Sequence, residues 1–238
     1  RGLPFLFRVH QEPDAESIER FVEIALTLLP GTSEAALSSL PRLRRWIESL
    51  PDSPLGRTVQ RFFLRSLRKA VYSPVDLGHF GLGIREYCHF TSPIRRYPDL
   101  FDHRRIKELI DGRPSAVPFE EMHGNALRSS RAEINSEQAE REMIRLKVAR
   151  YLERRLGEVA PGRVTGVSPL GLFIELEPIP VEGFLPREAL PIGFRLADDR
   201  MAFIDPRSRF ELRPGDRVEV QVMRVDLRAR RVEFAPAD

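Results

Sequence analysis

An eleven-residue segment near the middle of the chain combines a helix-start signal with two adjacent arginines. Residues 89–99 read HFTSPIRRYPD. Ser92 and Pro93 predict a helix start, because a serine hydroxyl can cap a free backbone N–H and proline is favoured at the first helical position. Arg95 and Arg96 would then lie in the first turn, where backbone N–H groups and the helix dipole favour an anion. Guanidinium groups suit phosphate oxygens, so the segment predicts a phosphate-binding site.

A second proline complicates this interpretation. Pro98 would remove a hydrogen bond inside a helix that starts at Pro93. We therefore expect a short first turn, a kink, and then a regular helix to about Asp111. The alternative is a capped surface helix whose two arginines are only solvated, and capping and charge alone leave both interpretations open.

The rest of the N-terminal region must position this segment, and its apolar periodicity predicts mostly helices. Phe5, Phe7 and Val9 alternate like a buried strand, which we expect to pair with strands preceding Arg1. The glycine-rich residues 78–83 predict a turn or strand pair, since they have neither the glycine spacing nor the lysine of a phosphate loop. Helices are expected over 14–29, over two pieces that begin at Ser33 and are divided at Pro41, over 55–70, and over 119–156.

Short strands dominate the C-terminal part of the chain. Gly157 and the Pro161-Gly162 pair mark a domain break, so we divide the chain into residues 1–157 and 158–238. Short strands separated by turns fit an OB-type barrel, a fold that binds single-stranded nucleic acid on one face. The sequence therefore predicts an α+β chain, mainly helical and followed by a small barrel. The expected strands are 162–168, 171–177, 182–186, 201–204, 217–225 and 230–235.

The composition is that of an ordinary globular protein, with 42% hydrophobic and 31% charged residues. The net charge of +3 is uneven: residues 158–238 hold 12 arginines against 14 acidic residues, and the preceding part holds 26 basic against 21 acidic. We therefore expect a polyanion to bind mainly to the helical part of the chain. The apolar runs are too short for a membrane span. The single cysteine, Cys88, excludes an internal disulfide and fits a reducing cytoplasm.

The arginine segment and its flanks resemble the ribonuclease II/R (RNB) family. The resemblance extends from Phe7 to the end of the chain. It implies the C-terminal part of an RNB catalytic domain (1–157) followed by an S1 RNA-binding domain (158–238). The residues that carry it are GHFGLG (78–83), Tyr87, HFTSPIRRYPDL (89–100), His103-Arg104, Lys107 and AERE (139–142).

The resemblance implies a processive, hydrolytic 3′-to-5′ exoribonuclease that degrades single-stranded RNA to 5′-mononucleotides. In this interpretation Arg95 contacts the scissile or terminal phosphate, and Glu140 positions Arg95 or the terminal ribose. The further RNA-binding residues that it implies are Arg96, Tyr97, His79, Arg163, Phe173 and Phe184.

Two of these roles compete with plainer interpretations. Glu140 falls on one helical line with Ile144, Lys147 and Tyr151, which predicts a partly buried carboxylate; the alternative is a solvated glutamate paired with Lys147. Phe173 matches a base-stacking aromatic of S1 domains, and the alternative is core filler.

The S1 resemblance has two departures. Leu170 stands where an aromatic is usual, and Pro186 stands where a histidine is usual. Because stacking contributes about 1–3 kcal/mol per base, we expect this domain to bind RNA more weakly than an S1 domain that has both of the usual residues.

The family's chemistry depends on aspartates that hold Mg²⁺, and the sequence before the barrel shows no tight aspartate cluster. We therefore expect the magnesium ligands upstream of Arg1. The expected partners are single-stranded RNA and the upstream part of the same protein, in a cytoplasmic monomer with no membrane contact. One alternative is a non-catalytic RNA-binding protein that keeps the chamber and barrel. An S1-bearing ribosomal or transcription accessory factor would explain the barrel but not the arginine motif.

Overall fold

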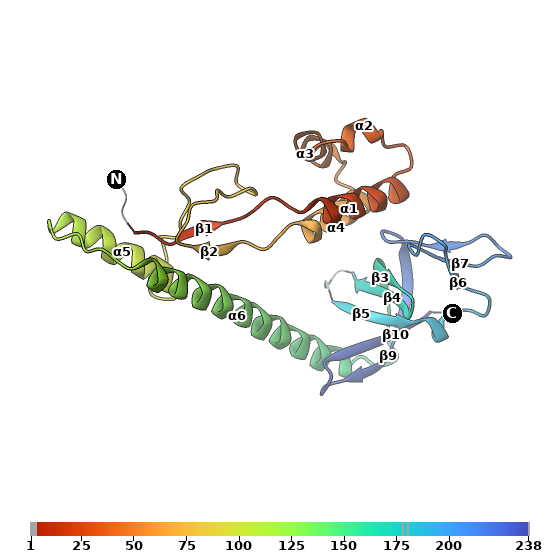
Figure 1. Ribbon diagram of the computed structural model, residues 1–238. Helices are drawn as coiled ribbons and strands as arrows, with labels where there is room; N and C mark the ends of the chain where they lie inside the picture. The colour runs from red at the N-terminus through yellow and green to blue at the C-terminus, as the bar shows by residue number, and fades with distance from the viewer. Residues whose placement is uncertain (1–3, 178, 180, 238) are drawn as a thin grey trace. The chain divides into compact units, whose positions relative to one another are not determined.

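The structure is a computed structural model that describes residues 4–177, 179 and 181–237. Helices dominate the chain up to residue 153, and strands dominate the remainder (Figure 1). The elements follow in the order β1 (Phe7–Val9), α1 (Ala15–Leu28), α2 (Glu34–Leu37), α3 (Leu40–Ser49), α4 (Pro54–Ser66), β2 (Val71–Ser73), α5 (Tyr97–Ile110), α6 (Phe119–Glu153), β3 (Val159–Ser168), β4 (Gly171–Leu176), β5 (Glu182–Pro186), a 3₁₀ turn η1 (Arg187–Ala189), β6 (Arg195–Leu196), β7 (Phe203–Ile204), β8 (Glu211–Leu212), β9 (Arg217–Asp226) and β10 (Arg231–Pro236).

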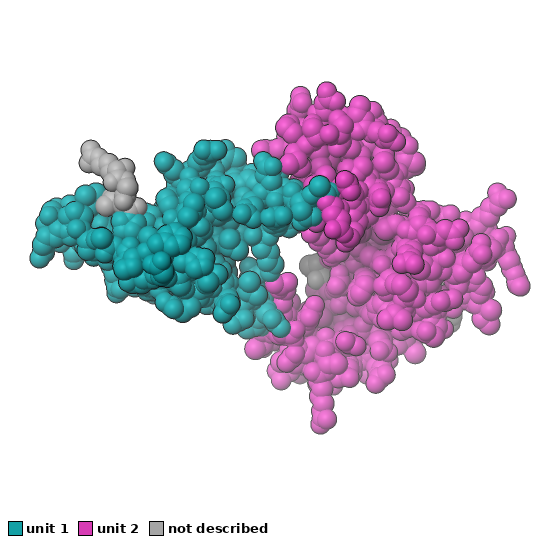
Figure 2. All heavy atoms as spheres, in the orientation of Figure 1, with its two compact units in different colours: residues 1–15, 67–140 teal, residues 16–66, 141–238 magenta. Residues whose placement is uncertain are grey.

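The chain divides into two compact units, drawn teal and magenta in Figure 2. The first unit contains residues 1–15 and 67–140, and the second contains 16–66 and 141–238. α6 contributes residues to both units, because it continues past residue 140.

In the first unit β1 pairs antiparallel with β2, and Phe7 also forms a β-bridge with Cys88. A segment about sixty residues later in the chain thus supplies one partner of this strand, and pairing with strands preceding Arg1 stays a prediction. Leu6, Tyr72, Phe101 and Ala126 form the buried core beneath this pair. This core joins the strands to α5 and α6.

The helices of the second unit agree with the amphipathic pattern of the sequence. Phe21, Ala25, Leu43 and Val59 are buried together, since apolar residues at helical spacing gather on one face. The expected division near Pro41 is confirmed by the break between α2 and α3. α4 ends four residues earlier than predicted, at Ser66, and the chain is extended again by β2.

The C-terminal strands close into a five-stranded barrel in the order β10-β5-β4-β3-β9, which confirms the predicted OB-type fold (Figure 1). Gly183 permits the packing inside it, because a Cβ there would lie 2.4 Å from the ring of Phe234. The predicted strand over 201–204 is the two-residue β7, which pairs with β6 and β8; the sequence pattern missed both of these strands. None of the described helices is long and apolar enough to cross a membrane.

Candidate functional site

The arginine segment forms a turn that precedes the helix. The N–H groups of Arg95 and Arg96 donate to the Ser92 carbonyl oxygen at 3.2 and 3.0 Å. α5 begins only at Tyr97, and Arg96 before it is extended, with φ −122° and ψ 114°. The expectation of a short first turn, a kink and then a regular helix to about Asp111 is therefore confirmed, but the two arginines lie in that turn and at the kink, outside the regular helix. Pro98 explains the later start, because a proline costs no hydrogen bond in the first turn of a helix.

A buried carboxylate holds this turn in place. The Asp99 side chain is fully buried, and its Oδ2 accepts hydrogen bonds from the Ser92 N–H at 2.7 Å and from Arg96 Nε and Nη2 at 3.2 and 2.8 Å. Burying a carboxylate is unfavourable unless it is paired and hydrogen-bonded. The fork of Arg96, predicted as an RNA contact, is thus already engaged by Asp99.

Two further side chains of α5 fix the neighbouring backbone. Asp102 is fully buried, and its Oδ1 accepts the Leu6 N–H at 2.9 Å. His103 Nε2 lies 2.7 Å from the carbonyl oxygen of Phe90, and the two rings stack with centroids 4.0 Å apart. α5 therefore braces both the N-terminal strand and the segment that carries Arg95.

Burial, together with the nearby Asp99 carboxylate, raises the pKa of Asp102 to about 7, although the hydrogen bond from the Leu6 N–H acts in the opposite direction. Burial, with the charges of Asp102 and Asp99, also raises the pKa of the Cys88 thiol, so this thiol is a poor nucleophile near neutral pH.

The raised pKa makes stability depend on pH. Because the pKa of Asp102 is higher in the folded than in the unfolded protein, folding is more favourable when this carboxyl is protonated. Its contribution to the free energy of unfolding is complete below the unfolded-state pKa and is lost as the pH rises through about 7. Asp102→Asn keeps an acceptor for the Leu6 N–H without the charge. We expect it to match the parent near pH 4 and to be more stable at pH 8, by up to about 1.4 kcal/mol per unit of pKa shift. Urea unfolding of both proteins at the two pH values measures this, with Asp111→Asn at the end of the same helix as control. An equal Asp102→Asn effect at both pH values would contradict the prediction.

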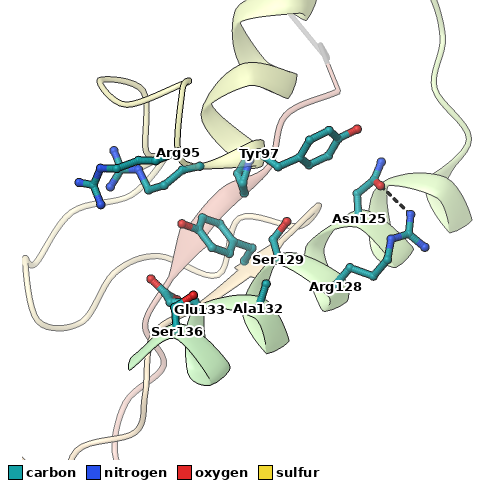
Figure 3. A pocket seen from close by; sticks show the side chains of 11 residues that line it. Arg95, Tyr97, Asn125, Arg128, Ser129, Ala132, Glu133 and Ser136 are labelled. Carbon is teal, nitrogen blue, oxygen red and sulfur yellow. Dashed lines mark hydrogen bonds between the residues drawn. The ribbon is translucent and has the colours of Figure 1, made fainter. Parts of the chain in front are cut away.

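A cavity of about 620 Å³ lies beside the arginine turn in the first unit. The turn and the first residues of α5 form one wall, and α6 forms the other (Figure 3). The volume suits a small ligand or part of a polymer. The lining residues are Tyr72, Arg95, Arg96, Tyr97, Pro98, Asn125, Arg128, Ser129, Ala132, Glu133 and Ser136.

The charges in this pocket are only partly compensated. Arg96 is paired with Asp99, and Glu133 is paired with Arg8 at 2.5 Å. Arg128 Nη2 instead donates to the neutral amide oxygen of Asn125 at 2.7 Å. Among the described residues, Arg95 and Arg128 have no carboxylate partner within ion-pair distance, so the pocket is suited to an anion.

Tyr72, which lines the pocket, belongs to a neutral hydrogen-bonded pair. The Tyr72 hydroxyl lies 2.8 Å from Nδ1 of His89. Burial raises the pKa of Tyr72, with Glu133 adding to it, and burial together with Arg96 lowers the pKa of His89. Both groups are thus neutral near pH 7, which fits a Tyr72 hydroxyl donating to the imidazole.

Two predicted site residues that precede the barrel, Glu140 and His79, lie outside the pocket lining. Glu140 is exposed on α6, one helical turn beyond Ser136. Its neighbours Ile144 and Tyr151 are exposed too, at 54% and 38%, so the expectation of a partly buried carboxylate was wrong: the described residues cover little of this part of α6. His79 packs in the turn near β1, with its ring centroid 5.1 Å from that of His10. Burial lowers the pKa of His79, with His10 lowering it further, which suits a structural imidazole.

The barrel presents an aromatic pair on its outer surface. Phe173 and Phe184 are register partners on β4 and β5, with ring centroids 5.3 Å apart. Phe173 is 39% exposed, so its interpretation as core filler was wrong. Arg163, predicted as an RNA contact, donates to the Gly215 carbonyl oxygen at 2.7 Å and to Glu177 at 2.9 Å, so its fork is engaged within the barrel.

The described residues do not fit a magnesium site. Within them, no group of three His, Cys, Asp or Glu side chains is arranged to hold a metal ion. Asp99 and Asp102, the two buried aspartates of α5, both accept hydrogen bonds from the surrounding protein.

Several pocket residues escaped the sequence interpretation, and all of them except Tyr72 of β2 lie on α6. The available signal was their spacing, since positions 125, 129, 132 and 136 repeat at intervals of three or four and therefore share one helical face. The residues missed were Tyr72, Asn125, Arg128, Ser129, Ala132, Glu133 and Ser136.

Comparisons with known proteins agree with this architecture. Residues 1–112 match the family model of the RNB domain, and residues 153–235 match that of the S1 RNA binding domain. The chain is 36% identical over 244 residues to ribonuclease R of Aquifex aeolicus, with 98% of this chain and 34% of that protein covered. It is 34% identical over 241 residues to ribonuclease R 1 of Lactococcus lactis, with 98% and 29% covered.

The fold is also similar to that of Mycoplasma genitalium RNase R in its apo form. The TM-score is 0.84 at 23% identity, and the match covers 99% of this chain and 38% of that protein. The chain thus spans about a third of the length of the curated relatives that it matches. By the two domain matches and the similarity along nearly its whole length, the chain belongs to the ribonuclease II/R (RNB) family.

Proposed function

We propose that residues 1–238 form the C-terminal part of a processive, Mg²⁺-dependent exoribonuclease, acting as a cytoplasmic monomer. It would remove 5′-mononucleotides hydrolytically from the 3′ end of single-stranded RNA. The observation that carries the proposal is Arg95 in a cationic pocket, in a chain that is similar to ribonuclease R along its length. Support for the RNA substrate comes from the M. genitalium enzyme, which has been solved in complex with a single-stranded RNA.

In this proposal Arg95 binds the scissile phosphate. Negative charge on the phosphoryl oxygens is stabilised best by donors that are already oriented, and Asp99 holds the turn that orients Arg95. Tyr97, at 45% exposure, offers a ring to the same pocket, and Glu140 would position the terminal ribose. Arg96 would act by shaping the turn.

The barrel would guide RNA toward this pocket. The Phe173–Phe184 pair gives a stacking surface that any base can use, which suits an enzyme without sequence preference. We propose residues 1–157 as the catalytic-domain part and 158–238 as the RNA-binding domain. The magnesium ligands would lie outside residues 1–238.

A 5′-labelled single-stranded RNA tests the proposal. The longer protein that it requires should convert the RNA from its 3′ end to a short labelled product without accumulating intermediates, as a processive enzyme does. A chelator should abolish the reaction, since a bound Mg²⁺ would supply the activation of the attacking water. Residues 1–238 alone should bind RNA weakly and cleave none of it. Circular RNA is the control, since it has no end to degrade.

The other outcomes separate the alternatives. RNA binding without hydrolysis by the longer protein would favour a non-catalytic RNA-binding protein. Cleavage of circular RNA would exclude an exonuclease. Mononucleotide release by residues 1–238 alone would contradict the proposed location of the metal ligands.

A further inference from the structure

We infer that Arg128 binds a second phosphate of the RNA, distinct from the phosphate at Arg95, in the pocket between the arginine turn and α6. This inference rests on the proposed function, because it names a subsite for the same RNA. Arg128 is exposed on α6, three residues after the buried Asn125.

The charge balance of the pocket points to two anionic groups. Arg96 and Glu133 are each neutralised by an ion pair, with Asp99 and Arg8 respectively. The guanidinium groups that remain without a carboxylate in the described lining belong to Arg95 and Arg128. A ligand with one anionic group would compensate only one of them.

Arg128 is oriented before any ligand binds. Asn125 is 7% exposed, and its Oδ1 accepts from Arg128 Nη2 at 2.7 Å. Because the amide is neutral, it fixes the guanidinium without cancelling its charge. The guanidinium has five N–H donors, and this bond uses one of them. The others stay available for phosphate oxygens, and holding the fork in advance lowers the entropy lost on binding.

The placement of the two arginines favours an RNA backbone over a single nucleotide. Arg95 and Arg128 lie at opposite ends of the lining, with Tyr97 and Ser129 between them (Figure 3). The site thus has a guanidinium group at each end, with the aromatic ring of Tyr97 and the hydroxyl of Ser129 between them. Two successive phosphates joined by a nucleoside have this pattern, and the cavity of about 620 Å³ is within the range of ligand sites.

Binding of short RNAs with single neutral phosphates tests the inference. Residues 1–238 are titrated with a single-stranded oligonucleotide in which each phosphate in turn is replaced by an uncharged methylphosphonate. The parent protein should lose affinity at two positions. In Arg128→Ala, neutralising one of these two phosphates should no longer lower the affinity, and in Arg95→Ala the same should hold for the other phosphate. The reason is that each variant already lacks the contact that the neutral phosphate would remove.

The size of the effect is also defined. Arg128→Ala should weaken binding about 10- to 100-fold, the range for a hydrogen bond to a charged group. The slope of log K against log salt should become shallower by about 0.7, as expected for one single-strand phosphate contact. Arg128→Lys keeps the charge without the fork and should recover part of the affinity. If the alanine variant unfolds, the affinity of Arg128→Lys for the same oligonucleotides tests the inference in its place.

Arg131→Ala is the matched control, because Arg131 is an exposed arginine on the same helix outside the pocket lining. Equal affinity losses in Arg128→Ala and Arg131→Ala would overturn the inference, and so would coupling of Arg95 and Arg128 to one and the same phosphate. Phe173→Ala separates the two proposals. If it weakens binding while Arg128→Ala does not, only the second-phosphate subsite fails; if the parent protein binds no RNA, the proposed function fails as well.

Discussion

Arg95→Ala should lower the turnover of the proposed exoribonuclease by about 10²–10³, the usual cost of removing one preorganised donor from a developing oxyanion. The Arg95 side chain is exposed at the pocket, and only its backbone N–H is used, in the bond to Ser92 that shapes the turn. The substitution should therefore leave the fold unchanged and weaken RNA binding only by the loss of one phosphate contact. Single-turnover cleavage of a short labelled RNA separates the chemical step from binding.

Two variants make this result specific. Arg95→Lys should also be slow, because a point charge does not reproduce the two parallel bonds of a guanidinium. Arg104→Ala removes an exposed arginine of α5 outside the pocket lining and should behave like the parent protein. Near-parental turnover in Arg95→Ala would exclude the phosphate role.

Asp99→Ala should destabilise the protein by about 3–5 kcal/mol, as expected when one partner of a buried ion pair is removed. The variant leaves the Arg96 guanidinium, which is 21% exposed, without its carboxylate and leaves the Ser92 N–H without its acceptor. The turn that holds Arg95 would lose its brace, so cleavage should fall as well. Urea unfolding followed by the fluorescence of Tyr72 and Tyr97, both close to the turn in the first unit, measures the stability of that unit.

Asp111→Ala is the control for this prediction. Asp111 lies at the end of the same helix in a loose pair with Arg113 at 3.7 Å, where the Arg113 side chain is 82% exposed. Exposed pairs contribute about 0–1 kcal/mol, so the control should cost little. An Asp99→Ala effect as small as that of Asp111→Ala would show that the turn does not depend on the buried carboxylate.

The sequence by itself determined the elements that depend on local patterns. The helical period of α1, α4 and α6 and the short strands of the barrel are written in neighbouring residues, and the structure confirms them within a few residues. The family resemblance was equally local, because it rests on the continuous motif around Arg95 and on short motifs on either side of it. Pro93 and Pro98 each predicted a helix start, and the structure agrees with both: a short turn follows Pro93, and the regular helix begins at Tyr97.

Only the tertiary structure decided which of the predicted contact residues are still available. Arg95, Arg96 and Arg163 look alike in the sequence, yet Arg96 is held by the buried Asp99 and Arg163 by Glu177 and a backbone carbonyl oxygen. The second wall of the pocket, with Arg128, is contributed by a helix some thirty residues further along the chain. The physical reason is that a side chain's charge is fixed by its residue type, whereas its burial and its partners depend on residues distant in sequence that folding brings beside it.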